Sequence, residues 1–232
     1  MSLDTLTQPE FDTRREANEL AITLVGMSNL GKSFWANRLV DELGFDVIGC
    51  DDLIETELKD VLETDGFEGG ISDMARWMGQ PYDSRFASRQ QTYLDLETIT
   101  MKKIIDQLSH PPLNGNVVVD TTGSVIHTSE EICHALKVHS TVVHLEATPE
   151  MQRAMFELYM AEPKPVVWGD AYRSSEEQTS HETLEACYPQ LLGQRCELYR
   201  KMAQVTLARE TTLALENGEM FLDYVRNSLP II

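Results

Sequence analysis

Gly26-Met27-Ser28-Asn29-Leu30-Gly31-Lys32-Ser33 is the stretch that decides the fold of this 232-residue chain. It satisfies the pattern G-x-x-x-x-G-K-[ST], with the apolar run 21–25 before it and a helical pattern over 32–43 after it. Gly26 and Gly31 let the backbone turn so that successive N–H groups face one anion, and the helix dipole adds a favourable field. A chance match in a helix-capping turn would not explain the strand before it and the helix after it. The stretch predicts a phosphate-binding loop.

We expect this loop to bind ATP together with Mg²⁺. Lys32 would reach the β- and γ-phosphates, and the hydroxyl of Ser33 would coordinate the metal. Asp120 is expected to join the metal shell, because it ends the Val-rich run 116–119 as a carboxylate ends a buried parallel strand. The alternative is that Asp120 caps the turn 121–123. The expected nucleotide contacts are Gly26, Ser28, Asn29, Leu30, Gly31, Lys32, Ser33 and Phe34.

Short apolar runs alternate with longer helical segments along the chain. Thr128 and Glu131 are spaced as a capping box for one of these helices. The alternation predicts a three-layer α/β/α fold with about five parallel strands covered by helices on both faces. Strands are expected at 21–25, 45–48, 116–119, 141–145 and 205–208, and helices at 32–43, 51–62, 72–78, 83–108, 129–137, 149–161, 184–202 and 218–228.

The expected layout is one domain over residues 1–232. Its core would comprise about 20–50, 98–161 and 184–232, with a substrate-binding insertion at about 51–97. The polar stretch 162–183 contains Pro163, Pro165 and Gly169 and has no helical period. Because long aperiodic loops in compact domains are usually functional or disordered, we expect a lid there.

Composition limits the classes of partner. The formal net charge is −19, which disfavours a nucleic-acid partner. Residues 1–19 lack the apolar run of a signal peptide, and no stretch approaches the roughly 20 apolar residues of a membrane span. Cys50, Cys133, Cys187 and Cys196 are scattered, as expected for reduced thiols. A cytoplasmic protein without a membrane partner is expected, and the oligomeric state stays open.

Several landmarks resemble the shikimate kinase family, within the wider nucleoside-monophosphate-kinase-like group. Residues 24–33 resemble its opening strand and loop, and 43–45 with 50–55 resemble the acidic landmark that follows. The segment 164–167 resembles the base of its lid, and 195–200 resembles its R-x-x-x-Y-R helix motif. These landmarks come in family order from about residue 20 to 210. The resemblance implies a P-loop kinase that transfers the γ-phosphate of ATP to a hydroxyl group of a polar metabolite.

The sequence departs from the family pattern at three places that bear on the substrate. Gly49 replaces the first Asp of the D-x-D motif, and one hypothesis is that Asp120 takes over its work at the metal. Thr121-Thr122-Gly123 stands where the family has three glycines. Leu94 stands where the family has the Arg of F-R-x-x-E, so Arg89 or Arg85 would have to replace it.

The candidate residues for the chemistry follow from these landmarks. Asp51 would accept a proton from the acceptor hydroxyl or orient it, although a carboxylate at a helix N-terminus is the alternative. Lys164 and Arg173 would bring a cation from the lid onto the transferring phosphate, and solvated loop charges are the alternative. The expected catalytic residues are Lys32, Asp51, Lys164 and Arg173. The expected acceptor-binding residues are Asp51, Arg89, Thr122, Gly123 and Arg195.

Two other functions remain open at this point. A nucleoside or nucleotide kinase would use groups in the inserted region for base recognition, and Trp77, Gln80 and Tyr82 qualify. A P-loop ATP-binding protein with little turnover is the second alternative, because the substrate signature is eroded.

Overall fold

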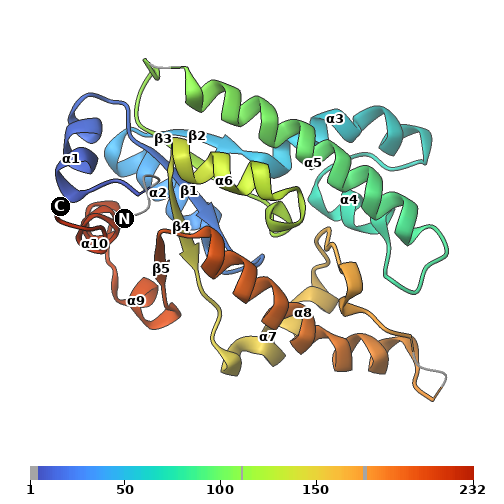
Figure 1. Cartoon of the computed structure of the whole chain (residues 1–232). Coiled ribbons are helices and arrows are strands. Elements are labelled where there is room, and N and C mark those ends of the chain that lie inside the picture. Colours follow the sequence, from blue (N-terminus) through green and yellow to red (C-terminus); the bar gives the residue numbers. More distant parts are fainter. Residues whose placement is uncertain (1–4, 111, 175–176) are drawn as a thin grey trace.

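The computed structural model describes residues 5–110, 112–174 and 177–232, and a parallel sheet lies at its centre (Figure 1). Its five strands stand in the order β2-β3-β1-β4-β5, and each strand pair is parallel. Because β1 lies in the middle, the loop that follows it leaves from the centre of the sheet. The predicted fold class is confirmed. The strands are β1 (Ala21–Val25), β2 (Asp46–Gly49), β3 (Val117–Asp120), β4 (Thr141–Leu145) and β5 (Val205–Leu207).

Helices cover both faces of this sheet. On one face α2 packs against α10, and α1 lies against α10; on the other face α6 and α8 pack against β4, with α5 beside α6 (Figure 1). The helices are α1 (Gln8–Glu16), α2 (Lys32–Leu43), α3 (Cys50–Thr64), α4 (Ile71–Met78), α5 (Phe86–Ser109), α6 (Glu130–His139), α7 (Gln152–Ala161), α8 (Ser180–Met202), α9 (Arg209–Ala214) and α10 (Gly218–Asn227).

Aromatic stacking joins α2 to α10. The ring of Trp35 stacks on the ring of Phe221 with their centroids 4.8 Å apart, and both side chains are buried. Large aromatic side chains that leave water each contribute about 2 kcal/mol or more. This contact therefore anchors the helix that begins at the phosphate-binding loop.

Two parts of the chain stand away from the sheet. Helices α3 and α4 pack against each other and against α5, at the right of Figure 1. The described residues between α7 and α8 are irregular apart from the short 3₁₀ helix Gly169–Ala171. They coincide with the predicted insertion and lid, whose division into functional parts stays a prediction.

Several predicted boundaries are wrong for identifiable reasons. The strand expected from Phe45 begins at Asp46, because the amide of Phe45 still bonds to α2 through the carbonyl of Leu39. The helix expected from Asp83 begins at Phe86, because the carboxylate of Asp83 accepts from the amide of Gln80 in a turn. The helix expected at residue 149 begins at 152, after one turn of 3₁₀ helix.

The capping signals also need correction. Ser129, and not Thr128, caps α6, because its hydroxyl accepts from the amide of Ile132 at 3.2 Å. Capping boxes do occur at Thr7 with Glu10 and at Thr179 with Glu182. The first starts α1, which was not expected, and the second starts α8 four residues before the expected position. Helix α9 was not expected either.

No helix among the described residues is long and apolar enough to cross a membrane.

Candidate active site

The loop between β1 and α2 has the backbone of an anion cradle. Gly26, Asn29 and Gly31 have φ values of 144°, 66° and 94°. A Cβ on Gly26 would lie 2.6 Å from the carbonyl oxygen of Leu145, so the close approach of this loop to β4 requires glycine. Positive φ values turn successive N–H groups to one side, and the N-terminus of α2 adds its dipole there. The loop can therefore hold phosphate groups.

Lys32 lies folded over this loop and is 7% exposed. Its Nζ donates to the carbonyl oxygens of Gly26 at 3.0 Å and Met27 at 3.2 Å. Burial lowers the pKa of Lys32, while the nearby carboxylates of Asp120 and Asp51 act in the opposite direction. An ammonium group held at the loop by backbone carbonyls is placed to meet an anion that enters the loop.

Two carboxylates follow neighbouring strands at the same edge of the sheet. Asp51 lies in the first turn of α3, directly after β2, and accepts a hydrogen bond from the hydroxyl of Tyr93 at 3.3 Å. Burial raises the pKa of Asp51, and the ammonium of Lys32 opposes this rise. Asp120 is the last residue of β3. The carboxyl ends of parallel strands face the ligand crevice of an open α/β sheet, so both acids lie beside the loop.

The strand register bears on the acid that the sequence lacks at Gly49. Gly49 pairs with Asp120 across β2 and β3. A Cβ on Gly49 would lie 2.8 Å from Oδ2 of Asp52, so a larger side chain would require that carboxylate to move. Asp120 is thus the carboxylate at a strand end that lies next to Gly49, where the family pattern has an Asp. This pairing favours the hypothesis that Asp120 takes over the metal-shell work, which stays a hypothesis.

A fully buried acid supports the turn after β3. Glu97 of α5 is 0% exposed, and its two carboxylate oxygens accept from the hydroxyls of Thr122 and Ser124, the latter at 2.6 Å. Burial raises the pKa of Glu97 to about 7, although both hydroxyls lower it. Thr122, a predicted acceptor-binding residue, is therefore held in place by a hydrogen bond to a residue of α5. The role of Glu97 was not predicted, although its i,i+4 spacing from Tyr93 and toward Met101 marks a buried position.

Because the pKa of Glu97 is raised in the folded protein, the stability of the protein should depend on pH. A group whose pKa is higher in the folded than in the unfolded state contributes stability that is present at low pH and lost as pH rises. We expect the free energy of unfolding of wild type to fall by about 3 kcal/mol, relative to that of Glu97→Gln, as the pH rises from about 4.5 to about 7. The lower limit is the pKa of the carboxyl group in the unfolded chain, and the upper limit is its pKa in the folded protein. Urea unfolding across this range measures it, with the exposed Glu130→Gln as the control. If the free energy of unfolding changed with pH in the same way for wild type and Glu97→Gln, this prediction would be contradicted.

Arg195 joins three parts of the site. It is 2% exposed, and its Nη1 donates to the carbonyl oxygen of Gly123 at 2.8 Å and contacts Sδ of Met27 at 3.4 Å. Its Nη2 donates to the carbonyl oxygen of Val167 at 2.6 Å. The hydroxyl of Tyr199, one turn along α8, also donates to Gly123. The predicted R-x-x-x-Y-R motif therefore connects the phosphate loop, the β3 turn and the predicted lid.

The other predicted cations differ in their positions. Lys164 is close enough for its charge to lower the pKa values of Lys32 and Asp51, so it lies near these two residues of the candidate site. Arg89 donates to Asp65 at 2.7 Å and to the carbonyl oxygen of Trp77, whose ring lies 5.4 Å from its guanidinium. Arg173 is exposed. The described contacts thus gather Lys164 and Arg195 at the site and tie Arg89 to α3 and α4.

The predicted lid packs against α5 and α7 through Trp168. The amide of Trp168 donates to Oε1 of Gln90 at 2.7 Å, and its indole N–H donates to the hydroxyl of Tyr159 at 3.4 Å. That hydroxyl in turn donates to Gln80. Trp168 is 1% exposed and therefore anchors the segment. The aromatic rings around it are those of Tyr159, Tyr172 and Tyr188.

The remaining predicted nucleotide contacts lie on the loop and the start of α2. Ser33 and Phe34 are exposed, and Ser28 is half-buried. Leu30 is 2% exposed and points inward. Ser28 lies beside the turn after β3, since a Cβ on Gly123 would be 3.6 Å from its backbone nitrogen and its hydroxyl. In the described residues no group of three or more His, Cys, Asp or Glu side chains is arranged to hold a metal ion.

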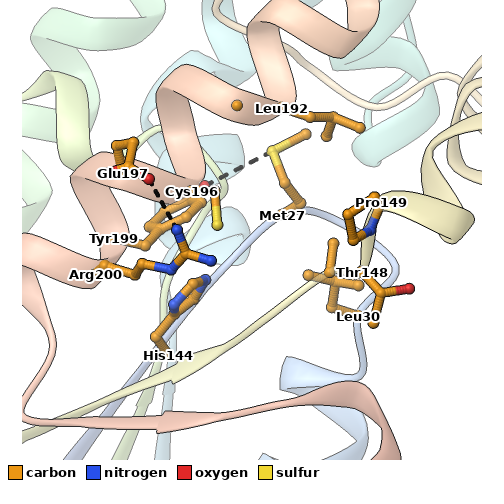
Figure 2. Close-up of a pocket in the computed structure, with 12 residues that line it drawn as sticks. Met27, Leu30, His144, Thr148, Pro149, Leu192, Cys196, Glu197, Tyr199 and Arg200 are labelled. Carbon is orange, nitrogen blue, oxygen red and sulfur yellow. Dashed lines mark hydrogen bonds and ion pairs between the residues drawn. The ribbon is translucent and has the colours of Figure 1, made fainter.

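A cavity of about 170 Å³ flanks the loop on the side of α8 (Figure 2). Met27 and Leu30 line it from the loop, and the side chain of Met27 points toward Tyr199 on α8. Burial lowers the pKa of His144, which lines the cavity from β4, to about 4, so its imidazole is neutral near pH 7. Lys32 and Asp51 are not among the lining residues, so this cavity is a neighbour of the candidate site.

Comparison with solved structures gives the same fold. A shikimate kinase from Acinetobacter baumannii in complex with shikimate is 20% identical, with 91% of this chain and 92% of that chain covered and a TM-score of 0.50. A shikimate kinase from Bacteroides thetaiotaomicron is 17% identical, with 90% and 95% covered and a TM-score of 0.54. A scan against protein-family models and a search of curated proteins give no match. The resemblance predicted from the sequence is confirmed as a likeness of fold: the chain has the three-layer fold of shikimate kinase-like P-loop kinases.

Proposed function

We propose that the protein transfers the γ-phosphate of ATP to a hydroxyl group of a small polar metabolite. One observation carries this proposal: the buried ammonium of Lys32 lies in the glycine-rich loop, and the carboxylates of Asp51 and Asp120 are close enough to shift its pKa. Phosphoryl transfer needs positioned groups and neutralised charge more than covalent chemistry by the protein. A phosphate cradle next to a carboxylate that can receive a proton meets both needs.

The nucleotide would bind with its phosphates in the loop. Lys32 would exchange the carbonyl oxygens of Gly26 and Met27 for phosphate oxygens, and the loop N–H groups would bind the same anion. The shikimate kinase neighbours of this fold support ATP as the phosphate donor. The proposed nucleotide contacts are Gly26, Ser28, Asn29, Leu30, Gly31, Lys32, Ser33 and Phe34.

The side chains near the loop fit Mg²⁺. Ser33 offers an exposed hydroxyl in the first turn of α2, and Asp120 offers a carboxylate at the end of β3. Mg²⁺ prefers oxygen ligands and is commonly bound through one or two protein groups together with substrate phosphates. When bound there, it would neutralise phosphate charge.

The proposed acceptor lies on the side of Asp51. The raised pKa of this carboxyl suits a group that receives a proton from an attacking hydroxyl, and the hydrogen bond from Tyr93 fixes its orientation. Thr122 and Gly123, which Glu97 and Arg195 hold in place, would contact the acceptor. Lys164 would approach the transferring phosphate from the lid, with Arg173 as a second lid cation.

Asp51→Asn is expected to lower kcat by about 100-fold or more, because general-base catalysis contributes at least this much. The KM for ATP should change little, since the phosphate loop is untouched. Steady-state kinetics with varied ATP measures the two constants separately. The matched control is Asp52→Asn, which removes the exposed neighbouring carboxylate. An equal loss of kcat and ATP affinity would move Asp51 from the acceptor side to the nucleotide side.

A panel assay tests the proposed function. ATP consumption with Mg²⁺ is measured with polyols, sugars, shikimate and nucleoside monophosphates, and phosphorylated product is identified by mass spectrometry. Turnover that requires one of the hydroxyl compounds supports the kinase. ATP binding without transfer to any acceptor would instead favour a P-loop binding protein, and absence of Mg-ATP binding would refute both.

A further inference from the structure

The cavity beside the phosphate loop has apolar walls from three separate parts of the chain (Figure 2). Met27 and Leu30 come from the loop, Ala147 and Pro149 from the connection between β4 and α7, and Leu192 from α8. An apolar cavity of about 150 Å³ binds benzene in another protein. A cavity of about 170 Å³ therefore has room for one six-membered ring with a small substituent.

Two aromatic rings and a sulfur atom face this space. The rings of His144 and Tyr199 lie with their centroids 5.1 Å apart, and Sδ of Met27 lies 3.9 Å from the hydroxyl oxygen of Tyr199. Aromatic rings and thioether sulfur both make favourable contacts with a further aromatic ring. The walls of the cavity thus suit an aromatic ring better than a saturated one.

The imidazole of His144 calls for one polar group on such a ring. His144 is 1% exposed, and its Nδ1 is buried with no hydrogen-bond partner among the described residues. A buried polar side chain without a partner costs free energy, and most such groups in proteins are paired. A hydroxyl or N–H group on the ligand would give the imidazole a partner.

The charges at the cavity are already matched. Glu197 and Arg200 are the charged side chains among the described lining residues, and they pair with each other at 2.8 Å. Arg200 also pairs with Glu146 at 2.6 Å. Burial lowers the pKa of His144 to about 4, so its imidazole is neutral near pH 7. A charged ligand would lose water without gaining an unpaired opposite charge, so an uncharged ligand is favoured.

Gly193 lies at the mouth of the cavity, in the interior of α8. It lines the cavity and is exposed. Outside its own helix, no heavy atom of the described residues would lie within 4 Å of a Cβ at this position. Glycine destabilises a helix interior relative to alanine, and no neighbour here requires the smaller residue. Its effect is to keep the entrance of the cavity wide.

Met27 connects the cavity to the phosphate loop. Its side chain lines the cavity, while its carbonyl oxygen accepts from Nζ of Lys32 at 3.2 Å. Its Sδ lies 3.4 Å from Nη1 of Arg195. A ligand that packs against Met27 therefore acts on a residue that contacts both cations. Two sites that share such a residue are expected to change each other's affinity.

We propose that this cavity is a second ligand site, separate from the phosphate site, for an uncharged aromatic ring that carries one hydroxyl or N–H group, and that its occupant acts on nucleotide binding through Met27. The proposal goes beyond phosphoryl transfer, because Lys32, Asp51 and Asp120 are not among the described residues that line the cavity.

Binding is measured by NMR at the methyl group of Met27, with phenol as the first probe. The protein is labelled with methyl-¹³C methionine, and the Met27 signal is assigned by its loss in Met27→Leu. We expect phenol to shift this signal saturably with a Kd of about 1 mM or lower. Benzamide should bind about tenfold or more tightly than benzoate, which is similar in size but charged. Absence of a saturable shift with both phenol and benzamide, or tighter binding of benzoate, would overturn the proposal.

Two variants of Gly193 test whether the probe enters this cavity. Gly193→Phe should weaken phenol binding by about tenfold or more, because the ring obstructs the entrance. The matched control Gly193→Ala should bind phenol within about threefold of wild type and unfold at a higher urea concentration, because alanine favours a helix. The other methionine methyl signals verify that both variants are folded. Unchanged binding by Gly193→Phe, or a lower urea midpoint for Gly193→Ala, would overturn the role of Gly193 as the entrance.

His144→Phe tests the polar group on the ligand. Phenol and toluene differ in their hydroxyl and methyl groups, so the ratio of their Kd values isolates the contribution of the hydroxyl. We expect the ratio of the toluene Kd to the phenol Kd to fall by about fivefold in His144→Phe, because the hydrogen bond to the imidazole is lost. An unchanged ratio would overturn the pairing with His144.

The link to the nucleotide is tested with Mg²⁺ and a non-hydrolysable ATP analogue. Phenol should still bind to the protein saturated with the analogue, with a Kd changed by about threefold or more. Calorimetry of the analogue with and without phenol should give the same factor, because coupling is reciprocal. Competition between the two ligands would show that the cavity belongs to the nucleotide site, and an unchanged Kd would overturn the coupling. Failure of Mg-ATP binding would refute the proposed function, while the phenol titration would still decide the second site.

Discussion

Replacement of Lys32 by alanine is expected to lower kcat for phosphoryl transfer by about 1000-fold, the loss typical of removing one preorganised charge from a reacting centre. The ammonium is buried in the loop and held by two backbone carbonyls, so it is already oriented before an anion arrives. Water cannot replace it without reorganising the loop. Single-turnover measurement of phosphate transfer, with circular dichroism to verify folding, measures this effect.

The control for this prediction lies away from the loop. Lys103→Ala removes a cation of α5 that pairs with Glu57 of α3 at 2.6 Å, and both side chains are exposed. An exposed ion pair contributes only about 0.5 kcal/mol, so this variant should keep its activity. If Lys32→Ala transferred phosphate at a rate near that of Lys103→Ala, the assignment of the phosphate site would be wrong.

Arg195→Met is expected to lower the free energy of unfolding by about 3 kcal/mol. Two effects compete in this substitution. Charge-assisted hydrogen bonds to the carbonyls of Gly123 and Val167 are lost, each with a typical value of about 2 kcal/mol, and the carbonyl of Val167 loses a donor. The substitution also removes the cost of burying a guanidinium whose Nε has no hydrogen-bond partner, and this offsets part of the loss. The lost bonds outweigh the gain because they connect three separate segments.

Arg200→Met provides the comparison for that variant. Arg200 lies one turn and a residue further along α8, is 51% exposed, and pairs with Glu146 and Glu197. Exposed ion pairs contribute about 1 kcal/mol or less. Equilibrium urea unfolding of both variants should therefore give a clearly larger loss for Arg195→Met. Equal losses would mean that Arg195 does not join the lid to the β3 turn.

The sequence predicted the parallel sheet and the phosphate loop because these features depend on local signals. The glycines of the loop are required by positive φ and by the carbonyl of Leu145, and the apolar runs of β1 and β4 are typical of strands that are buried on both faces. Asp51, Asp120 and Lys164 follow strand ends or a proline-marked loop, which are also local patterns. The grouping of Asp51 and Asp120 with Lys32 required only the topology of the sheet.

The parts that could not be predicted depend on contacts between distant segments. Nothing near Arg195 in the sequence indicates that its guanidinium meets carbonyls about 28 and 72 residues away. The full burial of the Glu97 carboxyl group is likewise explained only by the hydrogen bonds that it accepts from the hydroxyls of Thr122 and Ser124. The start of α8 is a different case, because the capping box of Thr179 and Glu182 was present in the sequence.

The three buried tryptophans give the protein a spectroscopic reporter in each of its parts. Trp35 lies in α2 against α10, Trp77 lies in α4 under Arg89, and Trp168 lies in the predicted lid. Indole emission shifts to longer wavelength when a buried ring meets water. Variants that keep a single tryptophan, with phenylalanine at the other two positions, would therefore report separately on the sheet, the insertion and the lid. A red shift confined to the Trp168 reporter would show that segment opening while the rest of the fold stays closed.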